Sequence, residues 1–252
     1  NIRSTRDDAA ALARVIRACA PDLVLLQEAP RFFRWRKKLA RLASASGLVI
    51  LSGGAPAAGP ALLCSLRATV ERTEDVLLPL TPGLHRRGFS TAVVRFGPAR
   101  LGVLSCHLSL NDAERYTQSG MLLDRLAGLG VSHTVAGGDL NEAPDGRTFR
   151  RLAATHQDCW ATAPWGAEHT SPTAQPHRRI DAVEIGVGDG DRLGRRPLVR
   201  DPAPAANVGK PDRGADRLDV AAIDAAVEHA PSRARADIGI RQRFGEPQRD
   251  AG

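Results

Sequence analysis

A chain of 252 residues is long enough for one large α/β domain, and its 42% hydrophobic residues can form a sizeable core. No stretch approaches the roughly 18 uninterrupted apolar residues that a membrane-spanning helix requires, so we expect no membrane span. The net charge of +7 favours polyanionic partners, such as nucleic acids, phospholipid headgroups or phosphorylated small molecules.

The four cysteines stand apart from one another, mostly beside apolar residues. They form no CxxC pair and no spacing typical of disulfides, so we expect reduced thiols, a cytoplasmic location and no zinc site. The chain starts at Asn1 rather than Met, and Asn1-Ile2-Arg3 is typical of the end of a strand. We therefore expect the first strand to be truncated.

The first part of the chain alternates helices with short apolar strands. Asp7 and Asp8 suit the positive end of a helix that reaches Cys19, and residues 22–27 predict a buried strand. A second helix is expected over 32–45. The stretch from 31 to 41, which includes the start of this helix, contains six cations and no acid: Arg31, Arg34, Arg36, Lys37, Lys38 and Arg41. A solvated helix face and a phosphate-attracting patch explain these cations equally well.

Strands dominate the next part of the chain. The segments that predict them are 48–51, 61–66, 69–77, 89–96, 100–106, 131–136 and 179–185. Asp112 is expected to cap a long helix that reaches Leu129, a loop is expected over 137–141, and a short helix over 146–154. Short turns such as Gly97-Pro98 link many strands, which favours two packed mixed sheets over a purely parallel one.

Polar side chains that could bind a ligand or take part in catalysis lie at the ends of several of these strands. They are Glu28, His107, Asp139, Asn141 and Asp181. Each alone has a simple structural explanation, such as a cap, a turn or a surface charge. Together they favour a site for a hard cation such as Mg²⁺, which prefers oxygen ligands.

Five short segments, in the same order, resemble the motifs of the endonuclease/exonuclease/phosphatase superfamily. PDLVLLQE at 21–28 resembles its PDxxxLQE motif, SCHL at 105–108 its xTHL motif, and GGDLN at 137–141 its GGDxN motif. RID at 179–181 resembles its RIDY motif, and NIR at 1–3 the end of its opening xWNIR strand. A single motif of this kind would be weak, but the five together extend over most of the chain.

The resemblance implies an α/β fold, a four-layer α-β-β-α sandwich of two mixed, largely antiparallel sheets flanked by helices. We expect this domain to occupy residues 1–185 and a divergent segment to follow over 186–252. It also implies that Asn1 and Glu28 hold a Mg²⁺ or Mn²⁺ ion.

The resemblance further implies roles for the remaining motif residues. Asp139 would orient or deprotonate the attacking water, and Asn141 would bind the phosphate and fix Asp139. His107 would donate to a non-bridging phosphate oxygen, and Asp181 would orient the family's final histidine. Arg87 is a weaker candidate for contact with the phosphate.

The family's last motif, Ser-Asp-His, does not occur in this sequence. The only histidine after Asp181 is His229, whose neighbours do not match. The nearest match is Ala215-Asp216-Arg217, which keeps Asp216 as a catalytic candidate and places Arg217 where the histidine should stand. Arginine stays protonated and cannot act as a base. Two interpretations stay open: a rewritten motif, or a segment after Val183 that is translated out of frame.

The expected function is divalent-metal-dependent phosphoester hydrolysis, by a phosphodiesterase, a nuclease or a phosphatase, through in-line attack of water. The alternative is a catalytically impaired family member that binds phosphate or nucleic acid. Arg217 favours the alternative, whereas Glu28, Asp139 and Asn141 favour the enzyme. The basic segment favours nucleic acid as the partner, and we expect a monomer. The scattered histidines are expected on the surface or in loops: His85, His133, His156, His169 and His177.

Overall fold

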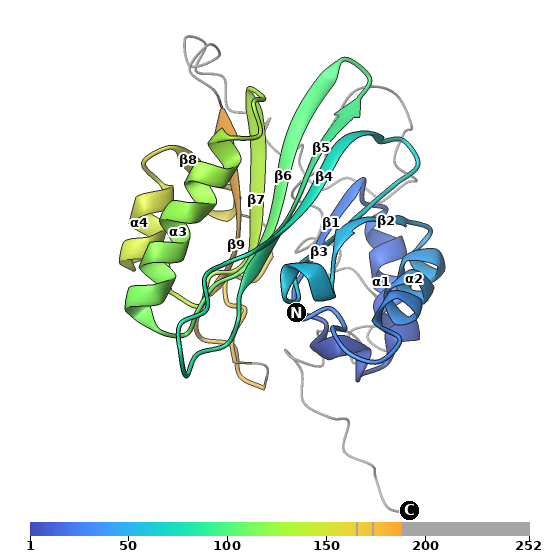
Figure 1. Cartoon of the computed structure of the whole chain (residues 1–252), viewed down its shortest axis with the longest axis horizontal. Helices are drawn as coiled ribbons and strands as arrows, with labels where there is room; N and C mark the ends of the chain where they lie inside the picture. The colour runs from blue at the N-terminus through green and yellow to red at the C-terminus, as the bar shows by residue number, and fades with distance from the viewer. Residues whose placement is uncertain (165, 173, 188–252) are drawn as a thin grey trace, which may run out of the picture.

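The computed structural model describes residues 1–164, 166–172 and 174–187. Two β-sheets face each other, and helices cover the outer face of each sheet (Figure 1). The smaller sheet has the strand order β1-β3-β2, and the larger has the order β4-β5-β6-β7-β9-β8. This arrangement confirms the expected four-layer sandwich of two mixed, largely antiparallel sheets.

The elements follow one another with short connections. The strands are β1 (Leu23–Leu26), β2 (Val49–Gly53), β3 (Ala61–Cys64), β4 (Thr69–Leu77), β5 (Gly88–Phe96), β6 (Ala99–His107), β7 (His133–Asp139), β8 (His156–Asp158) and β9 (Asp181–Val187). The helices are η1 (Arg3–Thr5), α1 (Ala9–Cys19), α2 (Trp35–Ser46), η2 (Ala55–Ala57), α3 (Asp112–Ala127), α4 (Arg147–Leu152) and α5 (Cys159–Thr162). None of these helices is long and apolar enough to cross a membrane.

The smaller sheet carries α1 and α2 on its outer face (Figure 1). Helix α1 begins where Asp8 accepts hydrogen bonds from the amides of Ala10 and Ala11. Its apolar face includes Ile16, which shares a buried cluster with Leu26 of β1. The apolar runs of this region therefore form the core that holds the end of β1 in place.

The larger sheet carries α3 and α4 on its outer face (Figure 1). Strands β5 and β6 form an antiparallel hairpin in which Phe96 pairs with Ala99, as Gly97-Pro98 predicted. Buried Phe89 and Leu104 of the sheet pack in one cluster with Leu122 of α3. A further apolar cluster between the two sheets includes residues from β3, β5, β6 and β7.

The topology brings the candidate residues to one end of the sandwich. Strands β6 and β7 run parallel, so their carboxyl ends meet, and His107 lies opposite Asp139. Strand β9 runs antiparallel to β7 and begins with Asp181, also opposite Asp139. The Ser105 hydroxyl donates to the carbonyl oxygen of Leu26 (3.0 Å), which ties the end of β1 to β6.

Several element boundaries differ from the expected ones, and the starts of α2 and α3 matter most here. Helix α2 begins at Trp35 rather than at residue 32, because Arg34 adopts a left-handed conformation (φ 56°). The expected cap of α3 was also misplaced by one residue. Asn111, not Asp112, accepts the hydrogen bond from the Glu114 amide (3.0 Å).

The glycine pair before Asp139 belongs to β7, although a loop was expected there. Gly138 has φ +148°, and a Cβ atom built on it would lie 2.0 Å from the carbonyl oxygen of Cys106. The strand therefore continues because glycine lets β6 and β7 approach closely at this point. Strand β8 and helix α5 were not predicted.

The predicted division of the chain at residue 186 stays a prediction. Most of the second segment, including Asp216 and Arg217, lies outside the described residues. Both interpretations of the missing final motif therefore stay open.

Candidate functional site

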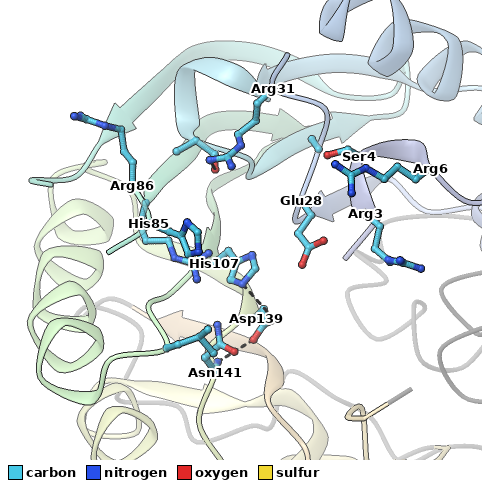
Figure 2. A pocket seen from close by; sticks show the side chains of 14 residues that line it. Arg3, Ser4, Arg6, Glu28, Arg31, His85, Arg86, His107, Asp139 and Asn141 are labelled. Carbon is cyan, nitrogen blue, oxygen red and sulfur yellow. Dashed lines mark hydrogen bonds and ion pairs between the residues drawn. The ribbon is translucent and has the colours of Figure 1, made fainter. Parts of the chain in front are cut away.

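A pocket of about 430 Å³ opens at the end of the sandwich where β1, β6 and β7 finish. Figure 2 shows that Glu28, His107 and Asp139 face the same space. These residues are far apart in the sequence, and the fold brings their side chains together. Asn141 also lines the pocket.

Glu28 follows β1 in a left-handed backbone conformation, with φ 55°. Hydrogen bonds hold this turn on both sides: the Ser4 amide donates to the Glu28 carbonyl (2.7 Å), and the Ala29 amide donates to the carbonyl of Gly59 (2.8 Å). A left-handed conformation at a residue other than glycine costs about 1–3 kcal/mol and often occurs at functional sites. The fold therefore holds Glu28 at the pocket in a strained turn.

Asp139 is only 4% exposed and has its two carboxylate oxygens occupied by different donors. The Asn141 backbone amide donates to Oδ1 (2.9 Å), and the Asn1 side-chain amide donates to Oδ2 (2.9 Å). Asn141 is itself fixed, because its Nδ2 donates to the Leu108 carbonyl (2.9 Å). This network gives the Asp139 carboxylate one orientation at the pocket wall.

Asn1 has one satisfied and one unsatisfied side-chain atom. Its Nδ2 is bonded to Asp139, whereas its Oδ1 is buried and has no hydrogen-bond partner among the described residues. A buried acceptor without a donor is costly. A cation beside it would remove this cost.

His107 lies across from Asp139, with 3.5 Å between His107 Nε2 and Asp139 Oδ2. Burial lowers the pKa of His107 to about 3, and the positive charges of Arg87 and Arg31 act in the same direction. The imidazole is therefore neutral at neutral pH, and the contact with Asp139 is not an ion pair. A distance of 3.5 Å is also long for a hydrogen bond, so the ring is available to a ligand.

Cations surround these groups. The pocket is lined by five arginines and by a second histidine: Arg3, Arg6, Arg31, Arg86, Arg87 and His85. Glu28 and Asp139 are the only acids among the lining residues. The pocket is therefore electropositive and suited to a phosphate group.

Arg87 and Arg31 are the two partly buried arginines of the pocket lining. The Nε of Arg87 is buried and has no hydrogen-bond partner among the described residues. Burial lowers the pKa of Arg87, while the charges of Asp139, Glu114 and Glu28 raise it. A guanidinium remains protonated at neutral pH, so Arg87 contributes positive charge to the pocket that it lines.

Asp181 is adjacent to Asp139 in the sheet but is not a lining residue of the pocket. The Asp181 amide donates to the Thr170 hydroxyl (3.3 Å). Asp216 lies outside the described residues.

Sequence reasoning missed most of the cationic lining. His85 was expected on the surface or in a loop; it is exposed, but it also lines the pocket, as do Arg3 and Arg6. Only their proximity to predicted site residues could have indicated them: Arg3 and Arg6 closely follow Asn1, and His85 precedes the Arg86-Arg87 pair. No periodicity marks such residues, because their positions depend on how the two sheets meet.

The oxygen donors at and beside the pocket fit a single hard cation. Asn1 does not line the pocket, but its Nδ2 is bonded to Asp139, which does. The described residues contain no group of three or more His, Cys, Asp or Glu side chains arranged to hold a metal. Mg²⁺, however, keeps several waters and needs only one or two carboxylates from a protein. The Glu28 carboxylate and the unpartnered Oδ1 of Asn1 are donors of this kind.

Comparison with known proteins identifies the family and the fold. The sequence matches the model of the Endonuclease/Exonuclease/phosphatase family over residues 1–232. No curated protein sequence matches significantly.

Solved structures with the same fold cover most of the described chain. Truncated TDP2 from Caenorhabditis elegans has a TM-score of 0.56 at 19% identity, covering 71% of this chain and 76% of that one. A mannosyl-6-phosphatase from Bacteroides thetaiotaomicron has a TM-score of 0.60 at 13% identity, covering 71% and 76%. An endonuclease/exonuclease/phosphatase from Bacteroides vulgatus has a TM-score of 0.58 at 14% identity, covering 69% and 78%. Identities this low indicate a shared fold.

Proposed function

The chain belongs to the endonuclease/exonuclease/phosphatase family, and from this premise we propose that it is a divalent-metal-dependent phosphoester hydrolase. The family acts on phosphoesters, and the proposed reaction is in-line attack of water on phosphorus. One observation carries the proposal: the Asp139 carboxylate is fixed by two amide donors at a basic pocket that Glu28 also lines. This combination joins a water-orienting acceptor to a site for a phosphate.

Asp139 is proposed to orient the attacking water and to accept its proton. A carboxylate held by Asn1 and Asn141 loses little freedom when it binds that water, which is how a prearranged group lowers the barrier. Asn141 contributes in two ways. Its backbone amide fixes Asp139, and the second hydrogen of its Nδ2 is available to a phosphate oxygen, since the first donates to Leu108.

The negative charge of the phosphoryl oxygens needs donors around it. A neutral His107 can donate one hydrogen bond from its ring, and Arg87 supplies positive charge at the pocket wall. Arg31 and Arg3 line the outer part of the same pocket. These side chains are proposed to bind the phosphate and to stabilise it as charge moves onto the leaving oxygen.

Glu28 and Asn1 are proposed to hold a Mg²⁺ or Mn²⁺ ion. Such an ion, when bound, neutralises phosphate charge and favours departure of the leaving oxygen. The strained turn at Glu28 and the unpartnered Oδ1 of Asn1 support this assignment.

The second candidate is a family member that binds phosphate or nucleic acid but hydrolyses it poorly. Arg217 favours it, because the nearest match to the family's final motif has arginine in the place of the histidine. An enzyme that cannot protonate its leaving group depends strongly on the leaving group's own acidity. It would hydrolyse nitrophenyl esters but not alkyl esters of phosphate.

A direct assay separates these candidates. Hydrolysis of bis(p-nitrophenyl) phosphate, p-nitrophenyl phosphate and an alkyl phosphodiester is measured with Mg²⁺ or Mn²⁺ and again with EDTA. Asp139→Asn should lower turnover by about a hundredfold or more, because it removes a proton acceptor. Asp124→Asn is the matched control, since Asp124 is exposed on α3 and does not line the pocket.

The outcomes are distinct. Metal-dependent turnover that falls in Asp139→Asn and not in Asp124→Asn supports the hydrolase. Turnover of the nitrophenyl esters alone supports the impaired member. Turnover that survives EDTA, or that is equal in Asp139→Asn and the wild type, refutes the proposed mechanism.

A further inference from the structure

Two phenylalanines next to the pocket are almost fully exposed. Phe32 and Phe33 are each 78% exposed, in the segment between Glu28 and α2. An isolated exposed apolar residue needs no explanation, but two adjacent aromatic rings at the edge of a binding pocket do. The remaining side chains of this segment indicate what the rings are for.

An arginine flanks this pair of rings on each side. The Arg31 guanidinium carbon lies 5.5 Å from the centroid of the Phe32 ring, and that of Arg34 lies 5.1 Å from the Phe33 ring. The stretch from Ala29 to Ser46 contains six cations and no acid. Arg31 also lines the pocket (Figure 2), so one arginine contacts both the pocket and the Phe32 ring.

The segment that carries the rings is anchored at both ends. The Ala29 amide donates to Gly59, and Arg31 Nη1 donates to the Ala58 carbonyl (3.3 Å). At the other end the Trp35 ring lies against Gly54, where a Cβ atom would be 2.8 Å from the ring. The rings therefore project from a fixed loop, and a ligand would not need to order them first.

The first turn of α2 lacks the features that normally stabilise a helix start. Its N-cap, Arg34, makes no side-chain cap, and the turn contains no acid. Arg36 and Lys37 stand there instead, where their charges oppose the helix dipole. Arg34 also holds an unfavourable left-handed conformation (φ 56°). An anion at this end of the helix would relieve the charge conflict.

We propose that Phe32 and Phe33 stack on the bases of a single-stranded nucleic acid whose backbone runs from the pocket along the basic start of α2. Aromatic rings bind any base through its flat face, while cations track the phosphates. A membrane surface is the less favourable partner, because it would account for the rings and the cations but not for their position beside a basic pocket suited to a phosphate. The inference rests on the proposed function only for the placement of one phosphate in the pocket.

The geometry limits the length of strand involved. Phe32 and Phe33 follow Glu28 by four and five residues, so their Cα atoms lie at most about 14 and 18 Å from that of Glu28. A stacked strand rises about 3.4 Å per nucleotide. The rings should therefore contact bases within about five nucleotides of the phosphate in the pocket.

Binding in EDTA tests the proposal without hydrolysis of the probe. Anisotropy of a fluorescent single-stranded oligonucleotide of about ten nucleotides is measured with the full chain, and again with the same sequence as a duplex. Phe32→Ala and Phe33→Ala should each weaken single-strand binding about tenfold, because stacking on one ring is worth that order of affinity. Leu66→Ala is the matched control. Leu66 is 84% exposed and lies at the opposite end of β1, since Leu23 pairs with Cys64.

Conservative variants distinguish stacking from other contacts. A variant with leucine at both positions keeps an apolar surface but cannot stack on bases, so it should bind the strand as weakly as the alanine variants. A variant with tyrosine at both positions should bind like the wild type. The ratio of the dissociation constants of Phe32→Ala and the wild type should stay unchanged as the oligonucleotide is shortened to about five nucleotides. Thermal melting of each variant checks that the fold is kept.

Several results would overturn the proposal. They are equal binding of single strand and duplex, equal binding by the alanine variants and the wild type, or full binding by the leucine variants. Leucine variants that still sediment with phosphatidylserine vesicles, together with weak binding of oligonucleotide by the wild type, would indicate a membrane surface instead. Strand binding that depends on the rings, in a protein without esterase activity, would support this inference and refute the proposed hydrolase.

Discussion

Glu184 lies on β9 in a buried cluster, and its titration should make the stability of the fold depend on pH. It is 3% exposed and pairs with Asp158 in the register of β8 and β9. Arg179 is bonded to Asp158 (3.0 Å from Nη1 to Oδ1), and Glu184 Oε2 has no hydrogen-bond partner among the described residues. Burial raises the pKa of Glu184 to about 8; the charge of Asp158 adds to the effect and that of Arg179 opposes it.

The sign follows from the protons bound in each state. An unfolded chain releases the Glu184 proton near pH 4.5, whereas the folded chain keeps it until about pH 8. Between these values the folded state binds more protons, so the free energy of unfolding falls as pH rises. A difference of about 3.5 pKa units corresponds to about 5 kcal/mol of stability lost between pH 4.5 and 8.

Urea unfolding at a series of pH values measures this dependence. In Glu184→Gln the decline should largely disappear, because a neutral amide occupies the site at every pH. That variant should therefore be more stable than the wild type at pH 8. Glu168→Gln is the matched control, since Glu168 is exposed. Parallel curves for the wild type and Glu184→Gln between pH 4.5 and 8 would refute the reasoning.

Three further changes test the site and its support. Gly138→Ala should cost at least about 2 kcal/mol in urea unfolding, because its Cβ would meet Cys106, whereas Gly130→Ala, with open space at φ +68°, should cost about 1 kcal/mol. Glu28→Ala should remove metal-dependent turnover and weaken Mn²⁺ binding by calorimetry, with an unchanged melting temperature. Arg217→His should raise turnover about a hundredfold if Asp216 belongs to the site; no gain would favour the out-of-frame interpretation.

The architecture could be predicted because it depends on local patterns. Apolar runs without helical periodicity marked β1 and β6, and the Gly97-Pro98 turn marked the hairpin of β5 and β6. Strand β8 and helix α5 have three and four residues, which is too short for any period to appear. Their positions depend on the pairing of Arg179 with Asp158, a contact between distant residues.

The predicted start of α2 was wrong for a different reason. Arg34 takes a conformation that favours glycine, and nothing in its side chain indicates this. The left-handed turn removes Phe32 and Phe33 from the helix on which the sequence placed them. Rings expected on a helix thus project from the loop beside the pocket.

The predicted site residues that line the pocket come together because strand pairing joins segments that are far apart in the sequence. Glu28, His107 and Asp139 each follow or end an apolar strand, and that local signal was visible in the sequence. The parallel pairing of β6 and β7 then sets His107 opposite Asp139, and it needs Gly138 to let the strands approach. The glycines of the GGDLN motif are therefore part of the site's geometry as much as its acid is. The cationic lining has no such constraint, because a long arginine side chain can reach the pocket from several backbone positions.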